Sequence, residues 1–170
     1  MKKKIGITGQ QGFVGLHLYN TLALSPEIFE RIEFERSFFE NEDELDAFVS
    51  QCDVIVHLAA MNRHEDQQVI YNTNIQLVKN LVASLERTNS NAHIIMSSSS
   101  QEEKDNLYGK SKKEGRNLFL NWEKNSSGVF SGLVIPNVFG PFGKPNYNSV
   151  VATFCHKVAF GEKPEIHVDG

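Results

Sequence analysis

Apolar and polar residues follow one another along this chain in a pattern that predicts strands and helices in regular succession. Short apolar runs typical of buried strands occupy residues 5–7, 53–60, 93–96 and 129–135. A run that alternates apolar and charged residues predicts another strand from Arg31 to Arg36. In the intervals, apolar residues recur at spacings of three and four, which predicts helices over residues 12–24, 41–50, 66–87, 108–124 and 149–160. A last strand is predicted over residues 165–168.

This alternation of strands and helices with short links predicts an α/β fold. We expect a Rossmann-like, doubly wound parallel sheet in a three-layer α/β/α arrangement, with right-handed crossovers between the strands. At 170 residues, with 40% hydrophobic and 22% charged residues, the chain has the size and composition of one globular domain. We therefore interpret residues 1–170 as a single domain.

The charge of the chain narrows the classes of partner. A net charge of −4 without a basic stripe argues against nucleic acid or an anionic membrane as the main partner. The lysines at residues 2–4 precede an apolar run that stops at Gly6, so no secretory core is predicted, and no membrane-length segment follows. Cys52 and Cys155 show no paired spacing and are typical of a reducing compartment, so we expect a cytoplasmic protein. The six scattered histidines predict no metal site.

Three glycines follow the first predicted strand, in the sequence Thr-Gly-Gln-Gln-Gly-Phe-Val-Gly. The first can adopt the positive φ of a tight turn, the second lets the backbone approach a pyrophosphate, and the third lets the next helix pack on the strand. The N-terminus of that helix would direct its N–H groups and positive dipole end at the phosphates. The predicted phosphate-binding loop comprises Gly9, Gln11, Gly12, Phe13, Val14 and Gly15. A glycine-rich turn without a ligand is the alternative interpretation.

The end of the second predicted strand decides between two dinucleotides. An acidic residue there binds the 2′-hydroxyl of the adenosine ribose in NAD, whereas an arginine accommodates the 2′-phosphate of NADP. Glu35 and Arg36 compete for this role. We favour NADP, bound by Arg36, and keep NAD as the alternative.

Tyr108 and Lys112 are four residues apart, which places them on one face of a predicted helix. A phenol with a pKa of about 10 is a poor acid at neutral pH, but a nearby ammonium and a nicotinamide cation would lower that pKa towards 7. Ser99 lies at the end of the preceding strand and can bind the same substrate oxygen, with Ser98 as the alternative register. His57 ends a buried strand and is interpreted as structural.

These residues resemble the short-chain dehydrogenase/reductase superfamily, in which Ser, Tyr and Lys form the catalytic set. The chain is similar over essentially its whole length to the extended branch, the epimerases, dehydratases and reductases of nucleotide sugars. The resemblance also rests on His-Leu-Ala-Ala from His57 and on Asn-Val-Phe-Gly-Pro from Asn137. It implies that the dinucleotide is also bound by Leu58, Ala59, Ala60, Asn74, Lys112 and Pro136.

Within this branch, two stretches look like the bacterial capsule and O-antigen reductases of the route to UDP-N-acetyl-L-fucosamine. They are residues 57–63 and 144–155. Polar residues in loops after strand ends, where open α/β sheets bind ligands, are the candidates for substrate binding. They are Asn62, Arg63, Asn137, Lys144, Asn146 and Asn148; Arg63 and Lys144 are candidates for a diphosphate. Plain loop chemistry is the alternative interpretation for each.

Three departures from the family pattern bear on function. Val134 stands where family members usually have an arginine, and Ser100 and Gln101 stand where sugar dehydratases carry an acid. The family continues into a substrate-binding half, and these reductases carry a cupin domain after it. We therefore expect the 170 residues to be the N-terminal part of a longer enzyme, with little activity alone.

The resemblance implies an NADP-dependent reductase of a 4-keto nucleotide sugar, with a nucleotide sugar as its substrate. An NAD-dependent nucleotide-sugar 4-epimerase and a non-enzymatic dinucleotide-binding module are the alternatives. We also expect homo-oligomers, because apolar side chains would lack their usual cover. These are Val150, Val151, Phe154 and Val158.

Overall fold

The computed structural model of the chain describes residues 1–165, and its internal contacts divide it into two compact units. The first unit, Met1–Val134, contains a sheet and its helices. The second begins at Ile135 and contains one helix. The interpretation of the chain as one domain stays a prediction.

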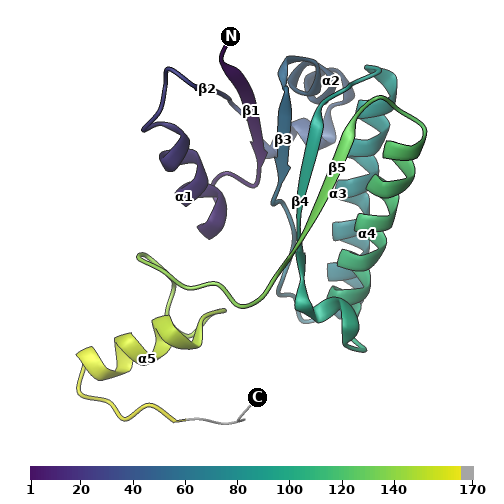
Figure 1. The fold of residues 1–170 in the computed structure, drawn as a ribbon. Helices are drawn as coiled ribbons and strands as arrows, with labels where there is room; N and C mark the ends of the chain where they lie inside the picture. Colours follow the sequence, from purple (N-terminus) through teal and green to yellow (C-terminus); the bar gives the residue numbers. More distant parts are fainter. Residues whose placement is uncertain (166–170) are drawn as a thin grey trace. The chain divides into compact units, whose positions relative to one another are not determined.

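The described strands of the first unit form one sheet in the order β2-β1-β3-β4-β5 (Figure 1). The strands are β1 (Lys3–Thr8), β2 (Phe29–Ile32), β3 (Val54–His57), β4 (His93–Ser99) and β5 (Val129–Ile135). β1 pairs in parallel with β2 and β3, and β3 pairs in parallel with β4. Because β1 has β2 on one side and β3 on the other, the strand order reverses at the carboxyl ends of β1 and β3. Open α/β sheets bind ligands at such a switch point.

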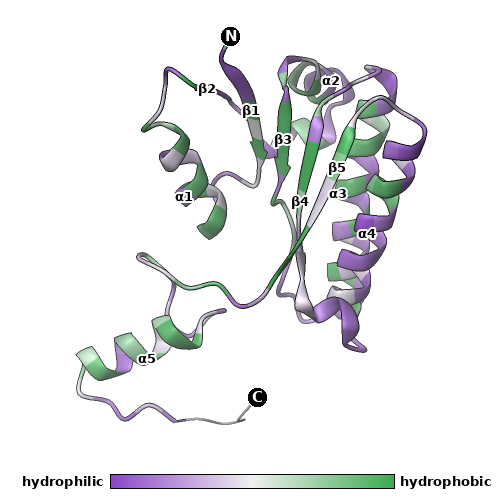
Figure 2. Cartoon of the chain, viewed as in Figure 1, coloured by the Kyte–Doolittle hydropathy of each residue, from purple (hydrophilic) through white to green (hydrophobic). Residues whose placement is uncertain are grey.

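Helices cover both faces of the sheet, as Figure 1 shows. The helix α1 (Phe13–Leu22) packs on one face through a cluster that includes Ile5, Ile7 and Val56. The helices α2 (Glu42–Gln51), α3 (Gln67–Arg87) and α4 (Leu107–Lys124) cover the other face. Figure 2 shows most of β3 in the colour of hydrophobic residues, as expected for a strand buried on both faces. The predicted Rossmann-like, doubly wound α/β fold is confirmed.

Side-chain caps explain where most of these helices begin. Asn41 accepts hydrogen bonds from the N–H groups of Asp43 at 3.1 Å and Glu44 at 3.4 Å at the start of α2. Asp66 and Asn106 cap α3 and α4 in the same way. Each cap satisfies N–H groups that have no partner within the helix. The predicted helices agree with the observed ones to within two residues at each end.

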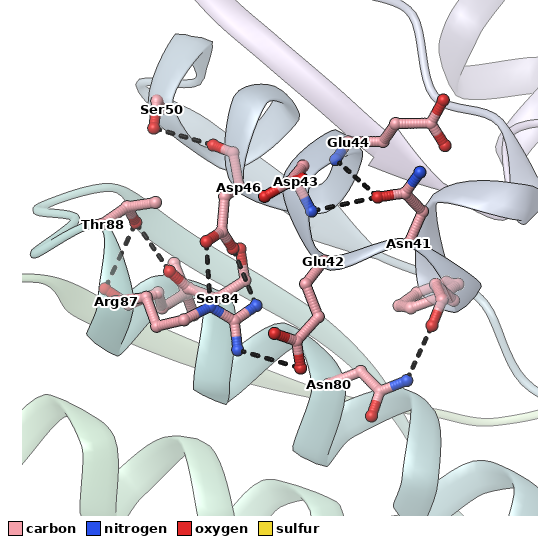
Figure 3. A network of polar contacts seen from close by, with 12 residues as sticks. Asn41, Glu42, Asp43, Glu44, Asp46, Ser50, Asn80, Ser84, Arg87 and Thr88 are labelled. Carbon is pink, nitrogen blue, oxygen red and sulfur yellow. Dashed lines mark hydrogen bonds and ion pairs between the residues drawn. The ribbon is translucent and has the colours of Figure 1, made fainter.

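A polar network joins α2 to α3 on the surface of this face (Figure 3). Arg87 donates to both carboxylate oxygens of Asp46, at 2.9 and 2.8 Å, and lies 3.6 Å from Glu42. The hydrogen bond from Arg87 is the main reason why the pKa of Asp46 is lowered. Asn80 of α3 donates to the backbone oxygen of Phe39 at 2.9 Å.

The second strand is shorter than the sequence predicts. It ends at Ile32, and the chain then forms a short 3₁₀ helix, η1 (Arg36–Glu40), so the predicted strand from Arg31 to Arg36 is wrong over most of its length. The reason is aromatic packing: Phe34 leaves the sheet and is buried against Phe39 and Phe48, at ring-centroid distances of 5.1 and 4.9 Å. The strand predicted over residues 165–168 falls outside the described residues except for Glu165.

Candidate active site

The glycine loop after β1 packs tightly on the loop after β3. Gly9 has a φ of +79°, and a Cβ at this position would lie 2.8 Å from the backbone nitrogen of Ala59. Gly12 donates its N–H to the oxygen of Gly9 at 2.9 Å, and a Cβ on Gly15 would lie 2.2 Å from that same oxygen. Neither Gly9 nor Gly15 can therefore carry a side chain without moving the loop.

The start of α1 fits a phosphate group. Gly12 is the N-cap residue and makes no side-chain capping bond, unlike the caps of α2, α3 and α4. The N–H groups of the first helical turn lack partners within the helix, and the positive end of the helix dipole lies at the same place. Gln11, Gly12 and Val14 are exposed, and Phe13 is half-buried. The loop therefore has the geometry of an anion-binding helix N-terminus at a switch point.

A buried pair holds the two loops at the end of the sheet. The hydroxyl of Thr8 is 2.9 Å from Nδ1 of His57, and the ring of His57 lies between those of Phe39 and Phe119. Burial, together with the positive charge of Lys112, lowers the pKa of His57 to about 3. A neutral, enclosed imidazole agrees with the structural role that the sequence predicts for His57.

The loop after β3 is fixed by the side chain of Asn74. Its amide oxygen accepts from the N–H of Met61 at 2.7 Å, while its nitrogen donates to the Met61 oxygen at 3.0 Å and to the Ser111 hydroxyl at 3.1 Å. Asn74 is thus engaged with the protein itself, and its predicted contact with the dinucleotide stays a prediction. Leu58, Ala59 and Ala60 are half-buried beside the glycine loop, whereas Asn62 and Arg63 are exposed.

Arg36 lies on η1 rather than at the end of a strand. Together with Phe39 and Glu40 it lines a hollow of about 440 Å³, whose other side is formed by α3 residues that include Thr73 and Gln76. Gln10 in the glycine loop donates to the backbone oxygen of Phe34 at 3.0 Å, which ties the glycine loop to the segment that leads to Arg36. Both Glu35 and Arg36 are exposed.

The three predicted catalytic residues lie where β4 ends and α4 begins. Lys112 is 4% exposed, and its ammonium donates to the backbone oxygen of Ser97 at 3.1 Å. The same nitrogen is 5.8 Å from the centre of the Tyr108 ring. The hydroxyl of Ser99 accepts from the N–H of Gln101 at 3.2 Å and caps a short 3₁₀ helix, η2 (Ser100–Glu103). Ser99 and Tyr108 are half-buried.

Burial dominates the acid–base properties of this group. Burial raises the pKa of Tyr108 in the chain without dinucleotide. The lowering expected beside a bound nicotinamide cation stays a prediction. The Lys112 ammonium lies over the face of the Tyr108 ring. Burial lowers the pKa of Lys112 to about 8, although the negative charge of Glu102 acts to raise it. The upward shift of the Tyr108 pKa comes from desolvation of the phenol.

Two charged residues beside this group were not predicted by any sequence motif. Glu102 accepts hydrogen bonds from Ser98 and from Arg116. Since the Ser98 hydroxyl is engaged in this way and the residue is only 4% exposed, the half-buried Ser99 is the more accessible of the two serines.

The remaining predicted site residues belong to the second unit. Lys144 lies over the ring of Tyr147 at 5.4 Å, and the N–H of Asn146, which has a φ of 54°, donates to the Thr153 hydroxyl at 2.9 Å. This bond ties the loop to α5 (Val150–Ala159), whose exposed apolar residues include Val150 and Val158. Exposed residues among the other candidates are Pro136, Asn137 and Asn148.

The glycine loop at the switch point of a parallel sheet defines a dinucleotide-binding protein of the Rossmann type. The chain matches the model of the NAD dependent epimerase/dehydratase family over residues 5–170, and it belongs to that family. Among the described residues, no cluster suited to holding a metal ion and no helix long and apolar enough to cross a membrane are present.

Two individual relatives are similar to this chain along most of its length. UDP-2-acetamido-2,6-beta-L-arabino-hexul-4-ose reductase of Pseudomonas aeruginosa is 35% identical over 156 residues, which are 91% of this chain and 41% of that protein. The crystal structure of the capsular polysaccharide assembling protein CapF from Staphylococcus aureus is 33% identical, with a TM-score of 0.75 over 97% of this chain and 43% of that one. The chain thus spans less than half of either relative.

A more distant structure shows the same fold. RMD from Pseudomonas aeruginosa, solved in complex with NADPH, is 21% identical, and its TM-score of 0.80 covers 93% of this chain and 60% of that one.

Proposed function

We propose that this protein is an NADP-dependent reductase of a 4-keto nucleotide sugar, acting on a UDP-linked deoxy-amino sugar in capsule or O-antigen synthesis. The observation that carries the proposal is the grouping of Ser99, Tyr108 and Lys112 at the end of β4 and the start of α4. The 35% identity to a reductase named for a 4-ulose UDP-sugar supports the substrate class. Residues 1–170 then form the dinucleotide-binding part of the enzyme.

Each residue has a defined task in this reaction. A bound nicotinamide dinucleotide supplies the hydride that reduces C4 of the sugar. Tyr108 gives its phenolic proton to O4, so that the ketone becomes a hydroxyl, and is reprotonated from solvent. Lys112 stabilises the resulting phenolate and binds the ribose of the nicotinamide, while Ser99 holds the substrate oxygen in line with the phenol. Asn62, Arg63, Asn137, Lys144, Asn146 and Asn148 bind the nucleotide sugar.

Tyr108→Phe tests this assignment directly. In a version of the enzyme that includes the sequence following Gly170, the substitution should leave NADPH binding nearly intact and reduce turnover of a 4-keto UDP-sugar by about 10²- to 10⁴-fold. Lys112→Met should weaken both. Retention of more than about a tenth of the activity by Tyr108→Phe would remove the tyrosine from acid catalysis. Interconversion of C4 epimers without net consumption of NADPH would contradict a reductase.

The choice of NADP rests on Arg36, which is exposed on η1 next to the segment held by Gln10. Fluorescence titration of the 170-residue chain should give tighter binding of NADPH than of NADH. Arg36→Ala should abolish that preference, and Glu35→Ala is the matched control that should retain it. Equal affinities in the unaltered chain would assign the ribose to Glu35 and the cofactor to NAD.

Three further properties are proposed with the function. The chain binds dinucleotide by itself but has little reductase activity, because hydride transfer requires a closed site with the reacting atoms about 3–3.5 Å apart. Exposed valines on α5 favour homo-oligomers. The enzyme works in the cytoplasm on a nucleotide-sugar substrate. Light scattering and parallel assays of the chain and a longer version test the first two: a monomeric chain with full turnover would contradict both.

A further inference from the structure

Glu102 is the centre of a polar cluster that joins β4, η2 and α4. Its carboxylate accepts a hydrogen bond from the Ser98 hydroxyl, and two more from Arg116, from Nε at 3.1 Å and from Nη2 at 2.5 Å. The side chain of Glu102 is only 7% exposed and that of Arg116 is 33% exposed. A buried carboxylate with three donors is held in one orientation, because each bond fixes a different direction.

Two glycines on neighbouring elements let the chain pack closely around this cluster. A Cβ on Gly132 of β5 would lie 2.8 Å from Cδ of Arg116, so the arginine stem packs directly over a strand glycine. A Cβ on Gly109 would lie 1.9 Å from the backbone oxygen of Gln101, so η2 packs on the first turn of α4. Glu102 therefore belongs to a segment that is fixed on two sides, between Ser99 and Tyr108.

The cluster is close to Lys112 in sequence and in space. Arg116 follows Lys112 by one helical turn, and Ser98 follows Ser97, whose backbone oxygen accepts from the lysine ammonium at 3.1 Å. Burial lowers the pKa of Lys112, and the negative charge of Glu102 raises it. His57 of β3 and Tyr108 of α4 are further titratable groups near this lysine.

We propose that Glu102 is a positioning residue of the active site: through Ser98 it holds the exit of β4, where the backbone oxygen of Ser97 accepts from the buried Lys112 ammonium. The part of this inference that concerns an active site rests on the proposed function. The electrostatic coupling between Glu102 and Lys112 belongs to the folded chain and is measurable without substrate or dinucleotide. Arg116 sets the strength of the coupling, because it neutralises part of the carboxylate charge.

The experiment is a titration of the 170-residue chain labelled with ¹³C at the lysine Cε, followed by NMR. The Lys112 signal is assigned by its loss in Lys112→Met. Glu102→Gln removes the charge at nearly constant shape and should move the Lys112 midpoint to lower pH by about half a unit or more. Glu103→Gln removes the same charge from the exposed neighbouring residue and should leave the midpoint unchanged.

Arg116→Gln gives the decisive contrast. It leaves Glu102 charged and removes its partner, so the Lys112 midpoint should move to higher pH. A cluster that only supports the fold would shift the midpoint in the same direction in both variants, or in neither. If Glu102→Gln does not fold, Arg116→Gln is compared with the double variant Glu102→Gln/Arg116→Gln, which differs from it only by the carboxylate charge: a lower midpoint in the double variant supports the proposal, and equal midpoints overturn it.

A second readout connects the coupling to catalysis. In the active enzyme, kcat/KM should fall at alkaline pH as Lys112 loses its proton, and Glu102→Gln should move that fall to lower pH by the same amount as the NMR midpoint. An unchanged profile in Glu102→Gln, with wild-type reductase activity present, overturns the positioning role. Absence of reductase activity in the wild type would instead refute the proposed function, while the NMR shifts would still test the coupling.

Discussion

The two faces of the central sheet are covered in different ways. On the face of α2, α3 and α4, a large cluster of buried side chains extends from Phe34 to Trp122 and includes Leu81, Leu85 and Phe119, each 0% exposed. On the face of α1, the buried cluster consists of Ile5, Ile7, Leu22 and Val56, of which Leu22 and Val56 are 9% exposed. Both clusters are described within the first unit.

This difference matches what each face contributes to the candidate site. Tyr108 and Lys112 are carried by α4, which packs on the densely covered face, so their backbone positions are fixed by buried side chains. The phosphate loop precedes α1, and it is held by backbone contacts at Gly9 and Gly15 instead. Side-chain packing thus holds the candidate catalytic residues, while close backbone contact holds the candidate binding loop.

The largest difference in stability is expected when one buried leucine on each face is replaced by alanine. Leu81→Ala removes a side chain from the centre of the larger cluster and should lower the free energy of unfolding by about 4 kcal/mol. Leu22→Ala should cost about 2 to 3 kcal/mol, because its site is partly open and can relax. Urea unfolding of both variants gives the two values. An equal or larger loss for Leu22→Ala would show that the faces are equally well packed.

The buried imidazole at the end of β3 makes the stability of the folded chain depend on pH. Because the pKa of His57 is about 3 in the folded chain and 6.5 in its ordinary state, the unfolded chain binds the proton first as the pH falls. The stability that neutral His57 contributes is therefore lost as the pH falls from about 6.5 towards 3, and about 2 kcal/mol is lost at pH 5.

His57→Gln tests this directly, since glutamine can still bond to Thr8 but does not titrate. At pH 7.5 the variant should be less stable than the unaltered chain, because it loses the ring contacts with Phe39 and Phe119. At pH 5 the difference should shrink by about 2 kcal/mol. Unfolding measured at both values decides it: a constant difference would mean that His57 is protonated in the folded chain.

Most of the fold follows from the sequence because its patterns are local. The spacing of apolar residues within single helices gave α3, α4 and α5 to within two residues, and the glycines gave the loop after β1. The end of β2 was wrong because the burial of Phe34 depends on Phe39 and Phe48, which lie on other elements. A local alternation of residues carries no information about such tertiary packing.

In the candidate site, contacts within one helix were predictable from the sequence, whereas contacts between elements were not. Tyr108 and Lys112 share a helix face, so their proximity follows from a spacing of four residues. The pairing of Glu102 with Arg116 joins residues on two elements and has no sequence signature. The burial that raises the pKa of Tyr108 in the chain without dinucleotide also has no local sequence signal, because it depends on tertiary packing.

The smallest effect is expected on the outside of the packed face, in the network of Figure 3. The side chains of Arg87 and Asp46 are 36% and 26% exposed, and such pairs contribute little because water screens them. Asp46→Asn should lower the free energy of unfolding by about 0.3 to 1 kcal/mol at low salt, and by less in 1 M NaCl. The control is Asp105→Asn, whose partner Lys110 lies 2.6 Å away in a more exposed pair, and no measurable change is expected. Since the pKa of Asp46 is lowered, its contribution should also disappear as the pH falls through that pKa. A loss as large as that of Leu22→Ala would mean that the α2–α3 contact depends on ion pairing rather than on the buried cluster beneath it.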